Sequence, residues 1–121
     1  MARETKAQRE ARLEADRLAQ VAVAKATYTE RMMAVLERAV RENFELTVRS
    51  AKFVAEDRDE RRVSPYVVQP TWTETADMDL YSLEVSVELK EEARADREQR
   101  ALVRATALAK LTAEERELLN L

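Results

Sequence analysis

The chain contains no cysteine, no histidine and no glycine among its 121 residues. Without cysteine and histidine it can form no disulfide, and it has no thiolate nucleophile, no imidazole base and no zinc site of the usual kind. Without glycine it lacks the loops in which backbone amides approach a phosphate group closely. These absences argue against nucleotide hydrolysis, dinucleotide chemistry and most acyl transfer. We therefore expect a protein that is not an enzyme and uses no cofactor.

Aromatic residues are also scarce, at 5%, whereas hydrophobic residues make up 45% and charged residues 37% of the chain. This composition is too apolar for a disordered chain and too highly charged for a membrane protein. No run approaches the roughly 18 apolar residues of a membrane span, and residues 1–17 hold no apolar segment typical of a signal peptide. We expect a soluble, cytoplasmic protein that folds as one domain over residues 1–121.

A long helix is predicted near the N-terminus. Thr5 and Gln8 have the spacing of a capping box, and good helix formers follow without proline. An uninterrupted helix from Thr5 to Glu42 would be about 57 Å long, whereas a compact domain of this size is about 35 Å across. The helix must therefore either break near residues 27–30 or project from the domain. Residues 1–20 are the candidate projecting arm.

The predicted arm carries small apolar residues on one side. They recur at a spacing of three or four positions, which is typical of one helix face, and we call them the seam: Ala11, Ala15, Leu18 and Ala22. From Val21 to Val40 apolar residues occur on all sides, so we expect that part to be buried. A projecting helix with such a seam needs another helix, and a second copy of the chain is the simplest source. We predict a homo-oligomer, most simply a dimer, paired through the seam.

The residues that follow alternate as in strands. Apolar and polar residues alternate over residues 44–49 and, with the opposite parity, over residues 51–55, which we interpret as one long strand with a β-bulge near Ser50. Continuation of the helix through these residues is the alternative. A second strand is predicted over residues 81–89, where apolar residues alternate with serine and glutamate. A short third strand is possible over residues 66–69.

Helical patterns return at the C-terminal end. Residues 91–110 form one predicted helix, and the capping-box spacing of Thr112 and Glu115 predicts a last short one. Because a small sheet must pack on helices, the order of elements predicts an α+β fold. It has a long N-terminal helix, an antiparallel sheet of two to three strands with a long connection, a C-terminal helix and a short terminal helix.

The connecting segment RDERRVSPYVVQPTWTET, residues 58–75, is the best candidate for contact with nucleic acid. It combines arginines, which can neutralise phosphates, with aromatic residues, which can stack on unpaired bases: Arg58, Arg61, Arg62, Tyr66 and Trp72. Acidic residues interleave with these arginines, so a plain strand connection is the alternative. The N-terminal arm is the other basic candidate, and there too acidic residues alternate with basic ones. The acidic sequence pI of about 5.2 argues against a large basic surface.

Two groups of carboxylates, at residues 57–60 and 77–79, resemble fragments of cation sites. A calcium loop needs more ligands and a glycine at its sharp turn, so we expect turn residues here and no metal.

In style the chain resembles small uncharacterised accessory proteins of tailed phages that infect GC-rich bacteria. The segments that carry this resemblance are the Arg/Ala-rich ARETKAQREARLEADR and the ending ALAKLTAEERELLNL, which are helix-forming sequences covering about a quarter of the chain. The resemblance implies an accessory protein that acts on host or phage components, and it assigns no functional residue. From the residues themselves, the predicted partners are a second copy through the seam, an unidentified protein and, as the alternative, nucleic acid.

Overall fold

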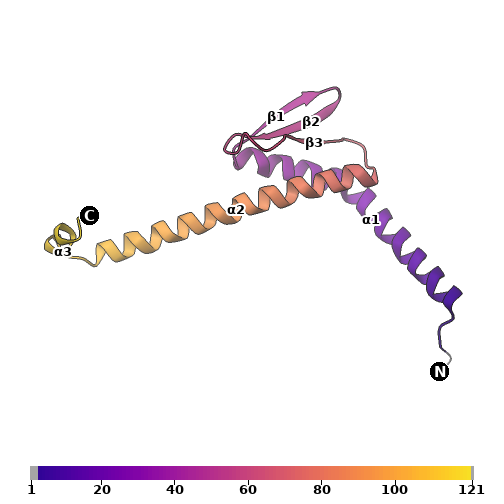
Figure 1. Ribbon diagram of the computed structural model, residues 1–121, viewed down its shortest axis with the longest axis horizontal. Helices are drawn as coiled ribbons and strands as arrows, with labels where there is room; N and C mark the ends of the chain where they lie inside the picture. The colour runs from indigo at the N-terminus through magenta and orange to yellow at the C-terminus, as the bar shows by residue number, and fades with distance from the viewer. Residues whose placement is uncertain (1–2, 121) are drawn as a thin grey trace.

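The computed structural model describes residues 3–120 and has the predicted α+β architecture (Figure 1). A long N-terminal helix leads into a three-stranded antiparallel sheet in the order β1-β2-β3, and C-terminal helices follow. The elements are α1 (Lys6–Arg41), β1 (Phe44–Arg49), β2 (Lys52–Asp57), β3 (Tyr66–Val68), α2 (Glu74–Ala109) and α3 (Ala113–Leu118). Residues 1–2 of the predicted arm and Leu121 lie outside the described residues.

Helix α1 runs without a break through residues 27–30, so the projecting alternative is the one observed. The Thr5 hydroxyl accepts a hydrogen bond from the Gln8 amide, and the Gln8 side chain accepts one from the Thr5 amide, as the capping box predicts. Residues 3–20 are exposed throughout, and Figure 1 shows this half of α1 extending away from the sheet. The predicted arm is therefore an unbroken continuation of a helix whose other end is in the core.

The single bulged strand predicted over residues 44–56 is wrong, because the chain reverses direction there. Strands β1 and β2 form a hairpin in which Arg49 pairs with Lys52. The two residues between them, Ser50 and Ala51, have φ values of 51° and 58°. Two consecutive left-handed residues are typical of a tight hairpin turn, which usually contains asparagine or glycine. The change of parity at Ser50 therefore marks a turn that lacks its usual residues.

The strand predicted over residues 81–89 is also wrong, because these residues belong to α2. The Thr73 hydroxyl caps this helix by accepting a hydrogen bond from the Ala76 amide, and the predicted helix over residues 91–110 is its C-terminal half. Buried residues along α2 are spaced by four, three and four positions, which is the helical period: Ala76, Leu80, Leu83 and Val87. The short strand predicted at residues 66–69 is confirmed as β3, and the last helix is confirmed as α3 with its capping box.

The core is small and lies where the sheet, the C-terminal half of α1 and the N-terminal half of α2 meet. Its buried side chains are Tyr28, Met32, Val35, Leu36, Ala39, Phe44, Ala55, Val68, Ala76, Leu80, Leu83 and Val87. The expectation that α1 is buried all round up to Val40 is wrong, since Met33 and Val40 are 59% and 56% exposed. The sheet and α2 cover neighbouring sides of α1 and leave a third side open.

Helices α1 and α2 lie parallel, and each extends beyond the other. Arg31 pairs with Glu84, and Arg38, seven residues farther along α1, pairs with Glu91, seven residues farther along α2. The overlap is limited to the core region, so the first half of α1 and the second half of α2 point in opposite directions away from it (Figure 1). Within residues 3–120, neither helix is apolar over a stretch long enough to cross a membrane.

Candidate interaction surfaces

The segment predicted to contact nucleic acid is divided by strand β3. Arg58, Arg61 and Arg62 precede the strand, whereas Trp72 follows it. The arginines therefore lie at one end of the sheet and the tryptophan at the other, near the start of α2. The structure does not bring the basic and aromatic residues together into one surface.

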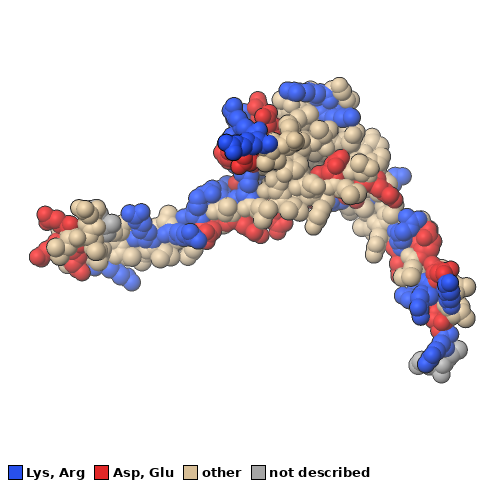
Figure 2. Space-filling view, viewed as in Figure 1, with Lys and Arg blue, Asp and Glu red and all other residues tan. Residues whose placement is uncertain are grey.

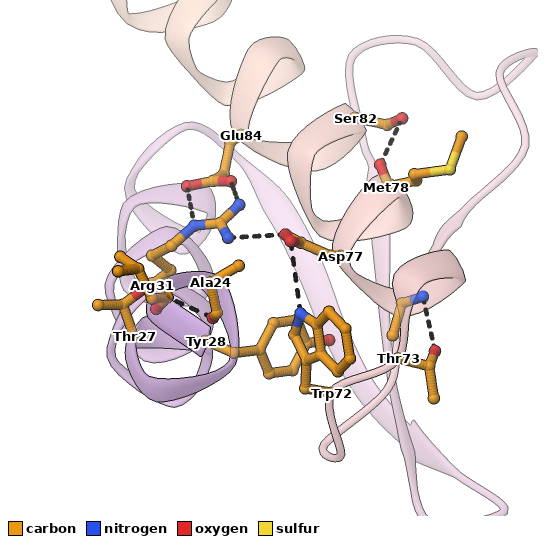
Figure 3. Close-up of polar contacts among 12 residues, drawn as sticks. Ala24, Thr27, Tyr28, Arg31, Trp72, Thr73, Asp77, Met78, Ser82 and Glu84 are labelled. Carbon is orange, nitrogen blue, oxygen red and sulfur yellow. Dashed lines mark hydrogen bonds and ion pairs between the residues drawn. The ribbon is translucent and has the colours of Figure 1, made fainter. Parts of the chain in front are cut away.

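Both aromatic residues of this segment take part in packing. The Tyr66 ring lies edge-on to Phe44, with 6.3 Å between ring centroids, and Trp72 is half-buried against the core. The Trp72 indole Nε1 donates a hydrogen bond of 3.4 Å to Asp77, which also accepts one of 2.7 Å from Arg31 (Figure 3). These contacts favour a structural role for the two rings over base stacking.

The loop between β2 and β3 is held against α2 by Lys90. Its Nζ donates hydrogen bonds of 2.6 Å to Asp57 and 2.8 Å to Asp59, and it lies 4.8 Å from the centre of the Phe44 ring. The hydrogen bond from Lys90 lowers the pKa of Asp59 below its ordinary value. The carboxylates that resembled a cation site are thus neutralised by an ammonium group, and no group of three or more metal-ligating side chains occurs within residues 3–120.

The arginines of the loop remain at the surface. Arg58 lies 3.8 Å from Glu45, a long ion pair between exposed side chains, and Arg61 and Arg62 form no ion pair with any residue that the structure describes. Figure 2 shows Lys and Arg side chains gathered at this end of the sheet, with acidic side chains directly below them. The loop therefore presents exposed arginines with acidic side chains beside them, as its sequence indicated.

The seam is exposed along its whole length. Ala11, Ala15, Leu18 and Ala22 all lie on the projecting half of α1, and Leu18 is 55% exposed. The seam residues share one face, and Val40 lies on the same face as Ala22 because the two are separated by about five full turns of helix. The seam is therefore the first half of an apolar face of α1 that continues past Ala26 and Met33 to Val40 and is exposed except at Leu36.

The second half of that face forms the floor of a groove between α1 and the β1–β2 hairpin, which we call the hairpin groove. It has a volume of about 740 Å³ and is lined mainly by apolar residues, with Met33 and Val40 on α1 and Leu46, Val48 and Phe53 on the hairpin. Val48 is 69% exposed. Glu30 and Glu37 form its rim, and none of the described residues lining it is basic. The hairpin groove is an acidic-rimmed apolar surface, and the sequence pattern did not predict it.

A second groove, of about 850 Å³, lies on the opposite side of α1, between that helix and the start of α2. Val21, Trp72, Met78 and Tyr81 contribute apolar side chains, and the Arg31–Asp77 ion pair crosses its floor (Figure 3). Its rim carries both acidic and basic residues, so its charge indicates no particular partner.

Among the described residues, one charged side chain is buried. Glu42, at the end of α1, is buried, and its Oε1 lies 3.0 Å from Nη2 of Arg94 on α2, although this oxygen accepts no hydrogen bond of good geometry. A carboxylate at the C-terminal end of a helix is unfavourable for the helix dipole. Arg94 compensates this charge and fixes α2 to the end of α1.

We compared the chain with protein-family models, curated proteins and solved structures, and none of the three comparisons finds a match.

Proposed function

We propose that the protein is a non-enzymatic, homo-oligomeric interaction protein, most simply a dimer, that pairs through the seam of α1. The observation that carries the proposal is the apolar face of α1 that runs from Ala11 to Val40 and is exposed except at Leu36, which is buried in the core. Over its first half no other element of the described chain, residues 3–120, packs beside it (Figure 1). Unpaired apolar faces of this length are typical of helices that associate with another helix.

The exposed area of the chain supports the proposal. A compact monomer of 13.9 kDa is expected to expose about 6,700 Å², whereas this chain exposes 9633 Å². The surplus of about 2,900 Å² exceeds the roughly 1,600 Å² that a standard protein–protein interface buries in total. A partner could therefore cover a full interface without reaching into the core.

The residue types of the seam favour a helix as the partner. Three of the four seam residues are alanine, and small side chains allow two helix axes to approach closely. The charged residues beside the seam keep the separated chains in solution. A small ligand would leave most of so long and flat a surface uncovered.

The experiment that tests the proposal compares two matched arginine substitutions. Ala15→Arg places a cation in the seam, whereas Leu13→Arg places one about 200° around the same helix, at a residue that is 54% exposed. We expect Ala15→Arg to shift the mass in sedimentation equilibrium toward one chain, and Leu13→Arg to leave it unchanged. Circular dichroism would verify that both variants keep their helix content. An unchanged mass for Ala15→Arg would refute the proposal that two copies pair through the seam.

A second candidate function is nucleic-acid binding by the loop that contains Arg61 and Arg62. Lys90 holds this loop against α2, at the end where Arg94 and Arg97 are exposed on the helix. Phosphate contacts by such residues would make affinity fall as salt rises. This candidate no longer involves Trp72, which lies at the other end of β3.

The test of this second candidate is the anisotropy of a labelled oligonucleotide at low and moderate salt. Replacing Arg61 and Arg62 by alanine should weaken binding and reduce its salt dependence. The matched control replaces Arg49 and Lys52 by alanine, at the opposite end of the hairpin. Equal affinity of the two double variants would exclude the loop as the site that binds nucleic acid.

A further inference from the structure

We propose that the hairpin groove receives the N-terminal arm of a second copy, so that the two α1 helices of the dimer lie antiparallel. The inference rests on the proposed function and specifies its geometry. Each copy contributes an arm and a groove, and the two contacts are related by one twofold axis. The interface is then closed and self-complementary, as in most homodimers.

The hairpin groove needs an apolar occupant. Met33, Val40 and Val48 are all more than half exposed although they line one continuous surface. Contiguous apolar surface of this kind is uncommon on monomers and marks interaction sites. The seam continues directly into this surface along α1, so a helix that pairs with the seam must also cross the groove.

The spacing along α1 fits an antiparallel arrangement. When Ala11 of one copy lies opposite Val40 of the other, Leu18 lies opposite Met33. This follows because Leu18 is seven residues after Ala11 and Met33 is seven residues before Val40. The same alignment places Ala22 opposite Thr29. The arm is rich in alanine and the groove half carries longer side chains, so small residues face large ones over most of the contact. A parallel arrangement would instead place alanine against alanine and Met33 against Met33.

Charge favours the same arrangement. Glu30 and Glu37 are exposed on the rim of the groove, and residues 3–20 of the arm carry five basic and four acidic side chains. In the antiparallel alignment Arg12 lies within about 3 Å, along the axis, of the level of Glu37. Glu37 already pairs with Arg41 at 3.0 Å and Arg12 with Glu4 at 2.9 Å, but all four side chains are exposed, so the Glu37 carboxylate can accept a second cation.

The experiment uses cysteine cross-linking, for which a chain without native cysteine is well suited. The full-length variants Ala11→Cys and Val40→Cys are treated with a short bis-maleimide, each alone and as an equimolar mixture. In the antiparallel dimer the two copies of residue 11 lie about 44 Å apart, so neither variant alone should cross-link. The mixture should give a covalent dimer. Mixing Leu13→Cys with Val40→Cys is the matched control and should give none, because Leu13 faces away from the seam.

The outcomes separate this inference from the proposed function. Cross-linking of Ala11→Cys with itself would show a parallel dimer, which overturns the inference and keeps the proposed function. Absence of any cross-link, with a dimeric mass in sedimentation equilibrium, would also overturn the inference alone. A single-chain mass for all variants and for the unmodified chain would refute both.

Discussion

Arg31 on α1 and Glu84 on α2 form an ion pair with 2.5 Å between Nη2 and the carboxylate. Arg31 also donates to Asp77, which lies seven residues, about two turns, before Glu84 on α2. The pair of Arg38 and Glu91 repeats the first contact seven residues farther along both helices. Ion pairs of constant spacing between parallel helices fix their alignment along the axis. This alignment determines how far each helix extends beyond the other, and hence how much of α1 remains uncovered.

Replacing Arg31 by alanine should destabilise the protein, because Asp77 and Glu84 are partly buried and would lose their cation. We expect the free energy of unfolding to fall by about 1–3 kcal/mol, measured by urea denaturation. Arg41→Ala is the matched control, since its pair with Glu37 joins two exposed side chains. Its effect should stay below about 1 kcal/mol. Equal losses in the two variants would contradict the role assigned to Arg31.

Stability should also depend on pH through Glu91. The hydrogen bond from Arg38 lowers the pKa of Glu91 in the folded protein below its ordinary value of 4.5. The unfolded chain therefore binds more protons than the folded one in this range, and stability rises with pH. The contribution of the pair is complete above about pH 4.5 and is lost as the pH falls through the folded pKa. Arg38→Gln should reduce this dependence in urea titrations at a series of acidic pH values, and an unchanged slope would contradict it.

A substitution by glycine should stabilise the protein at the hairpin turn, whereas the same substitution inside a helix should destabilise it. Ala51 has a φ of 58°, a conformation that costs an L-residue about 1 kcal/mol and glycine little. Ala51→Gly is therefore expected to raise the free energy of unfolding by about that amount. Ala34→Gly, the same substitution at an exposed site inside α1, should lower it by about 1 kcal/mol. Two changes of the same sign would show that the turn is not strained.

Local patterns predicted the parts of the fold that depend on local contacts. The capping residues Thr5 and Thr112 mark real helix starts, and the length of α1 correctly indicated that it must project if it did not break. These features follow from residues within one or two turns of one another. The short strand β3 and the α+β class could likewise be predicted from patterns among residues close together in the sequence.

The errors arose where distant contacts decide the structure. Residues 81–89 alternate as in a strand, but Leu80, Leu83 and Val87 bury a helical face against α1, and Glu84 pairs with Arg31. Contacts across 53 residues outweigh a local preference. The turn at Ser50 and Ala51 was missed because neither residue is usual in a left-handed conformation.

The candidate sites show the same division. The exposure of the seam followed from its position on the projecting helix, which sequence reasoning could predict. The hairpin groove was missed because it needs the β1–β2 turn, and the sequence pattern had placed a bulge there. The anchoring of the 58–65 loop by Lys90 joins residues 31 and 33 positions apart, and no local signal indicates it.

Sedimentation equilibrium of the unmodified chain over a wide concentration range tests the central claim most directly. The uncovered face of α1 predicts a mass that reaches twice 13.9 kDa and falls toward one chain on dilution. A mass of one chain at every concentration would contradict the claim that a second copy covers this face.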